Sequence, residues 1–299
     1  MKNIYIDTDC GMDDLVAIAM LLRRNQNLIK GISTVRGLTN PLIGKRNLKQ
    51  IIRYLNLSLP IYSGSNTALS KLGQKAAFPK QNITNSSRLA FLKDLFANKK
   101  ISQSEKSYNF FKSIIQENQK VDILCLGPLT NIARAIYKYK SRFTQKINRL
   151  IIMGGAVYSP GNVLPQRKSE YNFYLDPKAA KVVLSSGINI LLIPTDATRL
   201  VPTTTEIAQK IRKAQPKSET GILIQKTLLA NNNDFRYFYD PLAASILLDP
   251  SIVKTAQTVN IKVTSTGQTL PTIVSKSPIK VVVDIKPLKF YNMLLACLN

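Results

Sequence analysis

Histidine is absent from this chain, and acidic residues are few. The 299 residues include no histidine, three cysteines, and 17 aspartates and glutamates against 42 lysines and arginines. Without histidine, every mechanism that needs an imidazole as acid, base or metal ligand is excluded, including a Ser–His–Asp triad. Cys10, Cys125 and Cys297 are far apart and form no Cys-x-x-Cys motif, so neither a zinc site nor a disulfide framework is indicated.

Long hydrophobic runs are also missing. No apolar stretch reaches the roughly 20 residues that a helix needs to cross a bilayer. After Lys2 comes a short strand with acidic residues, which does not resemble a signal peptide. Apolar residues nevertheless make up 44% of the sequence, enough to form a core. We therefore expect a cytoplasmic protein that does not enter a membrane.

The formal net charge is +25, which would suit binding to nucleic acid. Lysine and arginine are, however, spread along the chain. Their densest groups, at residues 45–53, 138–142 and 210–213, are not interleaved with aromatic residues as in a surface on which bases stack. We favour a solvated basic surface and do not expect nucleic acid as a partner.

Four acidic residues fall within eight positions near the N-terminus, namely Asp7, Asp9, Asp13 and Asp14. Clustered carboxylates repel one another, so a dense group needs a compensating cation or a chemical task. Capping of a helix would account for Asp13 or Asp14 but not for all four. An apolar β-type run precedes the group and an apolar helical run follows it. The carboxylates are thus predicted at a strand's C-terminal end, where open α/β sheets bind ligands.

Strand-like and helix-like segments alternate over the first two thirds of the chain. Apolar β-type runs occur at residues 4–6, 29–35, 121–126, 150–153 and 188–193, with helical patterns at 40–55, 108–117, 131–139 and 177–185. This alternation predicts βαβ units and a mostly parallel sheet. A helix-rich stretch at 204–248 follows, then β-prone sequence at 252–263, 272–274 and 279–283 and a final helix at 287–295. The Lys-rich stretch 63–107 is the least regular.

Other polar residues also follow the ends of predicted strands. A Gly127-Pro128 turn comes after Leu126 and can leave the Leu126 carbonyl free to coordinate a cation. Carboxylate and carbonyl oxygens are the ligands that Ca²⁺ or Mg²⁺ prefers, while asparagine and glutamate suit sugar hydroxyls. The further candidates are Asn162, Glu170, Asn172 and Asp240.

These segments resemble the nucleoside hydrolase family of the inosine-uridine-preferring type. The stretch from Asp7 to Asp14 matches the family's opening, Asp-Thr-Asp-Pro-Gly-x-Asp-Asp, at every position except Cys10. Further blocks match in the family's order at 127–133, 153–155, 161–162, 170–172, 176–180 and 240–243. The resemblance implies a single α/β domain over residues 1–299, with a Rossmann-like, mostly parallel central sheet flanked by helices, a helix-rich C-terminal part and late β-strands.

The resemblance also implies the reaction, which is hydrolysis of the N-glycosidic bond of a ribonucleoside, with Ca²⁺ as the cofactor. The ion would be held by Asp9, Asp14, Asp240 and the main-chain carbonyl of Leu126. A water on the ion would be the nucleophile, with Asp9 as general base. The ribose hydroxyls would be held by Asp13, Asn162, Glu170, Asn172 and Asp240. Family members are commonly homodimers or homotetramers.

The match fails where the leaving base would lie. Tyr239 occupies the position at which many members have a histidine as general acid. Tyrosine, with an unperturbed pKa of about 10, is a weaker acid at neutral pH and could instead stack on the base. Leu38 replaces the asparagine of the family's Gly-Asn, and the family's His-Gly-x-x-Gly segment is not recognisable at 82–89. The base is therefore not assigned by the sequence.

Two alternatives to an active ribohydrolase stay open. A catalytically weak homologue could bind nucleosides or ribosides as a sensor or carrier, in which case binding would occur without turnover. A basic protein associated with nucleic acid is the less favoured alternative, and it would show steeply salt-dependent binding.

Overall fold

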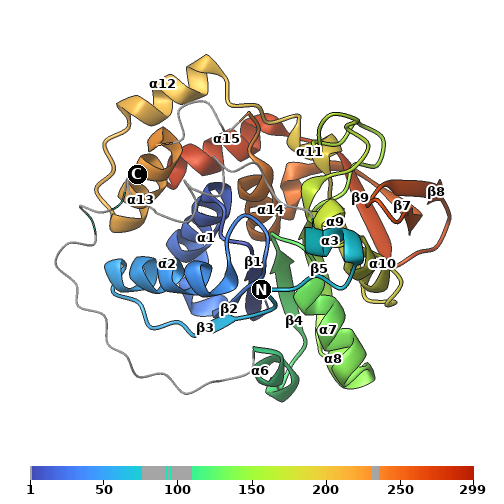
Figure 1. Cartoon of the computed structure of the whole chain (residues 1–299). Coiled ribbons are helices and arrows are strands. Elements are labelled where there is room, and N and C mark those ends of the chain that lie inside the picture. The colour runs from blue at the N-terminus through green and yellow to red at the C-terminus, as the bar shows by residue number, and fades with distance from the viewer. Residues whose placement is uncertain (1, 76–91, 93–94, 96–109, 231–235) are drawn as a thin grey trace.

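The structure is a computed structural model that describes residues 2–75, 92, 95, 110–230 and 236–299. Within these residues nine strands form one sheet (Figure 1). The strands are β1 (Ile4–Thr8), β2 (Ile29–Thr34), β3 (Ile61–Ser63), β4 (Val121–Cys125), β5 (Ile147–Met153), β6 (Ile190–Ile193), β7 (Val253–Val263), β8 (Thr269–Ile273) and β9 (Ile279–Ile285). The sheet order is β3-β2-β1-β4-β5-β6-β9-β7-β8.

Helices pack on both faces of this sheet (Figure 1). They are α1 (Met12–Asn25), α2 (Pro41–Tyr54), α3 (Lys71–Lys75), α6 (Phe110–Gln116), α7 (Thr130–Tyr139), α8 (Ser141–Thr144), α9 (Tyr171–Leu175), α10 (Pro177–Leu184), α11 (Thr195–Thr198), α12 (Thr205–Lys213), α13 (Glu219–Ala230), α14 (Tyr239–Leu248) and α15 (Pro287–Ala296). Two begin in the same way: the side chains of Asn40 and Asp176 cap α2 and α10, each directly before a proline that suits the first helical turn.

The strand order reverses beside β1. From β1 the chain runs outward to β2 and β3, then returns to place β4 on the other side of β1 and continues to β5 and β6. These pairs are parallel, as is the pair of β6 with β9, whereas β7 is antiparallel to both β9 and β8. The carboxyl ends of β1 and β4 therefore meet at a switch point, where open α/β sheets form a ligand-binding crevice.

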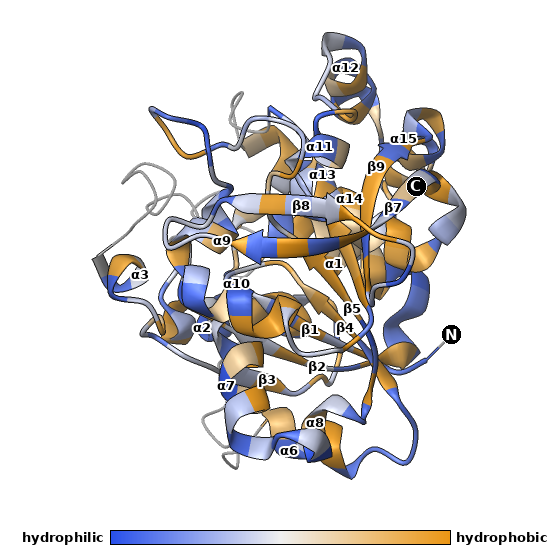
Figure 2. Cartoon of the chain, turned by 90° about the vertical axis from the view of Figure 1, so that its right-hand side faces the viewer, coloured by the Kyte–Doolittle hydropathy of each residue, from blue (hydrophilic) through white to orange (hydrophobic). Residues whose placement is uncertain are grey.

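Alternating side chains of the strands build two cores, one on each face of the sheet. In β1, Ile4 and Ile6 join the core that contains α1, α13 and α14, whereas Tyr5 joins the core that contains α7 and α10. This follows from the strand period of two residues. The central strands are largely hydrophobic on both faces (Figure 2), as expected for a parallel sheet covered on both sides.

The predicted fold class is confirmed, with differences in detail. Strand β3 was not predicted because three residues are too short a run to stand out from a turn. The strand expected at 272–274 begins earlier, at Thr269. Most of the Lys-rich stretch 63–107, including the segment 82–89, lies outside the described residues. In the described part of the chain, no helix has the length and hydrophobicity needed to span a membrane.

Candidate active site

The acidic motif occupies the turn between β1 and α1. Asp9 and Cys10 directly follow the strand, Gly11 precedes the helix, and Asp13 and Asp14 lie in its first turn. Cys10 has a positive φ of 59°, a left-handed conformation that few non-glycine residues adopt and that the proline of the family motif could not. Replacement of the family's proline by Cys10 is thus accompanied by a backbone conformation that proline cannot adopt.

Cys10 has no nucleophilic environment. Burial raises the pKa of its thiol, and the nearby carboxylates of Asp14 and Asp9 raise it further. Its thiolate is therefore disfavoured at neutral pH. Cys10 is therefore not a nucleophile of the site.

Three carboxylates converge at the carboxyl edge of the sheet. One oxygen each of Asp13, Asp14 and Asp240 lies within 4.8 Å of the others. Asp14 and Asp240 are buried, and burial raises the pKa of both. The charges of Asp9 and Asp13 add to the rise at Asp14, and those of Asp14 and Asp13 add to the rise at Asp240. Asp240 comes from the first turn of α14, more than 200 positions along the chain, so the tertiary fold alone creates this group.

The three carboxylates fit a hard divalent cation. The Oδ1 atom of Asp240 is buried and accepts no hydrogen bond from any residue that the structure describes. A buried, unpaired carboxylate oxygen is costly, and a cation between the three groups would remove both this cost and their repulsion. Since every donor atom is an oxygen, Ca²⁺ or Mg²⁺ suits the site better than zinc or copper.

Asp14 is held in place by the turn itself. Its Oδ2 accepts a hydrogen bond from the Gly11 N–H at 2.9 Å, and its Oδ1 accepts one from the Thr8 hydroxyl. The same hydroxyl accepts a hydrogen bond from the Cys10 N–H at 3.0 Å. The orientation of Asp14 is therefore fixed by strand β1 and the start of α1.

Asp9 is buried beside this group and is held from the loop after β2. Its Oδ2 accepts a hydrogen bond from the Leu38 N–H at 3.0 Å. A Cβ on Gly37 would lie 2.0 Å from the same oxygen, so only glycine permits this approach. Burial raises the pKa of Asp9 to about 7, the Asp13 charge adds to the rise, and the Leu38 N–H opposes it. Asp9 also contacts Asp14, although it lies outside the group of three.

Asp7, the remaining aspartate of the motif, is a structural residue. Its Oδ1 accepts hydrogen bonds from the Ser33 hydroxyl and from Asn131 Nδ2, the latter at 2.7 Å. Asn131 also bonds to the Thr34 carbonyl and to the Ser65 N–H. The network joins β1, β2 and the start of α7. The sequence carried no signal for this role, because Ser33 and Asn131 lie on other elements.

Three predicted sugar-binding residues follow β5. Glu170 is buried and accepts hydrogen bonds from the backbone N–H groups of Gly155, Asn172 and Phe173. Burial raises the pKa of Glu170 to about 7, and the Asp9 charge adds to the rise. The three N–H donors lower the pKa and so oppose this rise. Asn172 Nδ2 donates to the Met153 carbonyl at 3.2 Å, and Asn162 Oδ1 accepts from the Tyr171 N–H at 2.9 Å.

Tyr239 lies close to both Asn162 of this segment and the carboxylate of Asp13. It is the first residue of α14, and its ring packs edge-on against Tyr237, with centroids 6.0 Å apart. Burial raises the pKa of Tyr239 to about 12, the Asp13 charge adds to the rise, and the Asn162 side chain opposes it. The preceding residue, Phe238, is fully buried against Phe290.

Leu126 is buried directly after β4, and its N–H donates to the Asp7 carbonyl at 2.8 Å. It therefore lies beside the end of β1, as the prediction requires. The structure thus gathers the predicted residues from β1, β4, the segment after β5 and α14 at one edge of the sheet. The roles assigned to them, including those of Leu126 and Asp9 as metal ligands, stay predictions.

The sheet and this group of side chains define an α/β protein with clustered carboxylates at a switch point of the strand order. The chain matches the family described as "Inosine-uridine preferring nucleoside hydrolase" over residues 4–292. It therefore belongs to this family, whose members are hydrolases that act on the N-glycosyl bonds of ribonucleosides.

Individual relatives agree with this assignment. Uridine nucleosidase 1 of Arabidopsis thaliana is 32% identical in a match that covers 66% of this chain and 57% of that protein. The probable ribonucleoside hydrolase of Dictyostelium discoideum is 29% identical, with 99% and 94% covered. The crystal structure of the inosine-uridine preferring nucleoside hydrolase from Bacillus anthracis has a TM-score of 0.84 at 24% identity, covers 100% of this chain and 99% of that one, and supports the fold.

Proposed function

We propose that this chain hydrolyses the N-glycosidic bond of ribonucleosides in a Ca²⁺-dependent reaction and releases base and ribose. The observation that carries the proposal is the buried Asp240 Oδ1, which has no hydrogen-bond partner in the part of the chain that the structure describes. The Asp240 carboxylate converges with those of Asp13 and Asp14. The names of the Arabidopsis and Dictyostelium relatives specify uridine and ribonucleosides, which supports this substrate class.

The cation would be held by Asp14, Asp240, Asp9 and the Leu126 carbonyl, with Asp13 within reach. A bound divalent cation orients a water and lowers its pKa. Asp9 accepts the proton of the attacking water. It suits this role because the Leu38 N–H and the close approach of Gly37 fix its carboxylate on one side.

The sugar would be held by the remaining polar residues, namely Asp13, Asn162, Glu170, Asn172 and Asp240. Cleavage of a glycosidic bond passes through a cationic, oxocarbenium-like transition state. Carboxylates already oriented by backbone N–H groups, as in Glu170, stabilise such a charge without reorganising.

Tyr239 is proposed to face the leaving base. With its pKa raised to about 12, it donates a proton less readily at neutral pH than unperturbed tyrosine does. Stacking on the base, or a hydrogen bond to it, therefore fits this residue better than the role of general acid. Such a site would favour bases that leave without full protonation.

A panel of nucleosides with a reducing-sugar assay, in Ca²⁺ and in a chelator, tests this function. We expect at least one nucleoside to be cleaved in Ca²⁺ and none in the chelator. Asp284→Asn, at a carboxylate paired with Lys254 on the last strands, serves as a control that leaves the rate unchanged. If the protein binds Ca²⁺ and nucleosides tightly yet cleaves none of the panel, the binding homologue replaces the enzyme as the better interpretation.

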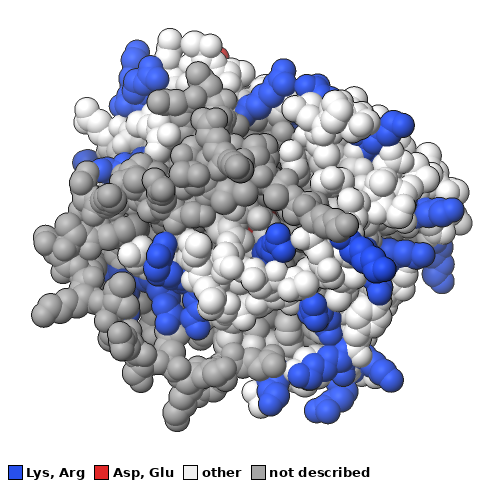
Figure 3. Space-filling model, viewed as in Figure 1, with Lys and Arg blue, Asp and Glu red and all other residues white. Residues whose placement is uncertain are grey.

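The cytoplasmic location and the homodimer or homotetramer stay predictions, as does the expectation that nucleic acid is not a partner. Lysine and arginine are spread over the face of the molecule in Figure 3 rather than confined to one patch. This supports a solvated basic surface over a nucleic-acid interface.

A further inference from the structure

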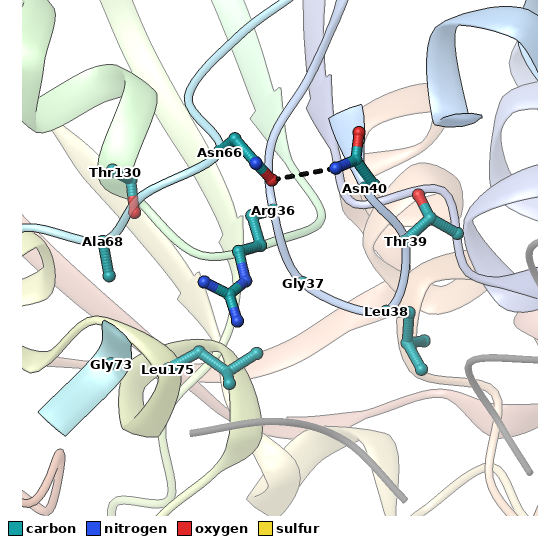
Figure 4. Close-up of a pocket in the computed structure, with 10 residues that line it drawn as sticks. All are labelled: Arg36, Gly37, Leu38, Thr39, Asn40, Asn66, Ala68, Gly73, Thr130 and Leu175. Atoms are coloured by element: carbon teal, nitrogen blue, oxygen red, sulfur yellow. Dashed lines mark hydrogen bonds between the residues drawn. The ribbon is translucent and has the colours of Figure 1, made fainter. Parts of the chain in front are cut away.

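A cavity of about 350 Å³ is lined in part by the loop that contacts Asp9 (Figure 4). Its walls come from the loop after β2, the segment after β3, the start of α7 and the end of α9. The residues that matter for its chemistry are Arg36, Gly37, Leu38, Asn66, Thr130 and Leu175. None of its described lining residues is an aspartate or glutamate.

Arg36 supplies the only charge among these lining residues. In Figure 4 its guanidinium extends into the cavity between Ala68 and Leu175. The residue is partly buried, and its guanidinium makes no hydrogen bond or ion pair with any residue in the described ranges. A guanidinium carries five N–H donors in a planar fork that matches an oxyanion, and leaving them partly desolvated without a partner is unfavourable.

Asn66 offers a second donor at the same cavity. Its Oδ1 accepts a hydrogen bond from Asn40 Nδ2 at 3.2 Å, which leaves its own amide N–H₂ as a donor (Figure 4). The hydroxyls of Thr39 and Thr130 are already used, because they donate to the Asp9 carbonyl and to Asp176. The groups that remain to contact a ligand are therefore a cation and an amide donor.

The cavity shares a wall with the proposed active site. Leu38 and Gly37 line the cavity, and the same two residues hold the Asp9 carboxylate. The carboxylates behind the walls, Asp9 and Asp176, both accept hydrogen bonds from backbone N–H groups. A ligand in the cavity would thus lie close to Asp9, with Gly37 and Leu38 between them.

We propose that the cavity at Arg36 is an oxyanion-binding site that takes a phosphate monoester or carboxylate of a small molecule. The guanidinium fork would form charge-assisted hydrogen bonds with the oxyanion. The oxyanion could belong to the substrate, as in a ribonucleoside 5′-monophosphate, or to a separate small anion. Only the first source rests on the proposed function.

Titration calorimetry with inorganic phosphate tests the site on the full chain, without added Ca²⁺ so that calcium phosphate does not form. We expect saturable binding that Arg36→Met weakens about tenfold or more. Arg36→Lys, which keeps the charge, should lose less. Arg142→Met, at an exposed arginine of α8, is the control for the general basic surface and should bind phosphate like the native protein.

The proposal is overturned if native protein shows no saturable phosphate binding, or if Arg36→Met and Arg142→Met bind phosphate equally well. Thermal unfolding of each variant shows whether it is folded. Should Arg36→Met be unfolded, the comparison of Arg36→Lys with Asn66→Ala takes its place, and native-like affinity in both also overturns the site.

Uridine and uridine 5′-monophosphate then distinguish the two sources. If the oxyanion belongs to the substrate, the monophosphate displaces phosphate, and Arg36→Met lowers its kcat/KM relative to that of uridine by about tenfold. If phosphate still binds when uridine is saturating, the oxyanion is a separate ligand. Phosphate binding through Arg36 in a protein that cleaves no nucleoside would contradict the proposed function and leave this site intact.

Discussion

The two parts of the candidate site differ in how their side chains are held. At the end proposed for metal and ribose, the carboxylates of Asp9, Asp14 and Glu170 each accept hydrogen bonds from backbone N–H groups. At the end proposed for the base, Tyr239 is positioned by a ring neighbour, Tyr237, and by the Asn162 side chain. The first arrangement is part of the fold, whereas the second can change without disturbing the backbone.

This difference explains where the sequence keeps the family pattern. A substitution at Asp14 would leave the Gly11 N–H and the Thr8 hydroxyl without their acceptor, so the turn itself would lose stability. A change at position 239 alters only which chemistry faces the leaving group. The end that defines the reaction is thus more constrained than the end that selects the base.

The largest effect should come from Asp9. Asp9→Asn keeps the size of the side chain but removes the proposed base, and we expect kcat to fall about 10²–10⁴-fold, as for loss of general-base catalysis. Reducing-sugar release from the best nucleoside of the panel measures it. Unchanged thermal unfolding would show that the fold is kept, and a rate within a few-fold of the native one would remove Asp9 from the chemistry.

Asp240→Asn tests the cation site, because it should lower Ca²⁺ affinity without lowering the stability of the Ca²⁺-free protein. Ca²⁺ affinity should fall about a hundredfold because one charged ligand is lost. In a chelator, by contrast, the variant should be at least as stable as the native protein, since an unpaired buried carboxylate and its repulsion of Asp14 are removed. Thermal unfolding with and without Ca²⁺ measures both, and a loss of stability in the chelator would contradict the account.

Cys10→Pro restores the family motif and yet should destabilise this protein. Proline fixes φ near −65°, whereas Cys10 has φ 59°, so we expect the free energy of unfolding to fall by about 2 kcal/mol. Urea unfolding measures the change, with Cys10→Ala as the control for lost packing. Equal stability of Cys10→Pro and Cys10→Ala would mean that this turn can adopt the conformation of the family.

Substitutions at Tyr239 should have the smallest effects on activity. They distinguish a residue that stacks on the leaving base from one that protonates it. If the ring stacks on the base, Tyr239→Phe keeps kcat/KM within about threefold, while Tyr239→Ala loses about tenfold or more. If the hydroxyl is the acid, the two variants lose activity equally. Tyr239→His, with a pKa nearer neutrality, should raise kcat most for nucleosides with poorly leaving bases. Rates across the nucleoside panel distinguish these cases.

Much of the fold was predictable because it rests on local patterns. The apolar runs of β1, β4 and β5 and the helical periodicity between them indicated a parallel sheet. Caps such as Asn40 before Pro41 mark helix starts directly in the sequence. Short elements were not predicted, because β3 and α9 contain too few residues to show a hydrophobic period. Their conformations depend on the strand or helix against which they pack.

The candidate site was predictable only in part. The residues of the motif could be chosen because clustered carboxylates after a strand are unusual in a basic chain. The role of Asp7 could not, because its partners Ser33 and Asn131 lie on other elements. Likewise, nothing near Arg36 in the sequence indicates that its guanidinium extends into a cavity.

The sequence by itself determined the chemistry available: no imidazole, an acidic turn between strand and helix, and alternating elements that form a parallel sheet. Only the tertiary structure decided which of these groups meet. It brings Asp240 from α14 to Asp13 and Asp14, leaves one of its oxygens without a hydrogen-bond partner among the described residues, and places Gly37 against Asp9. Proximity between distant segments depends on how the sheet is ordered and packed, and local sequence patterns do not encode it.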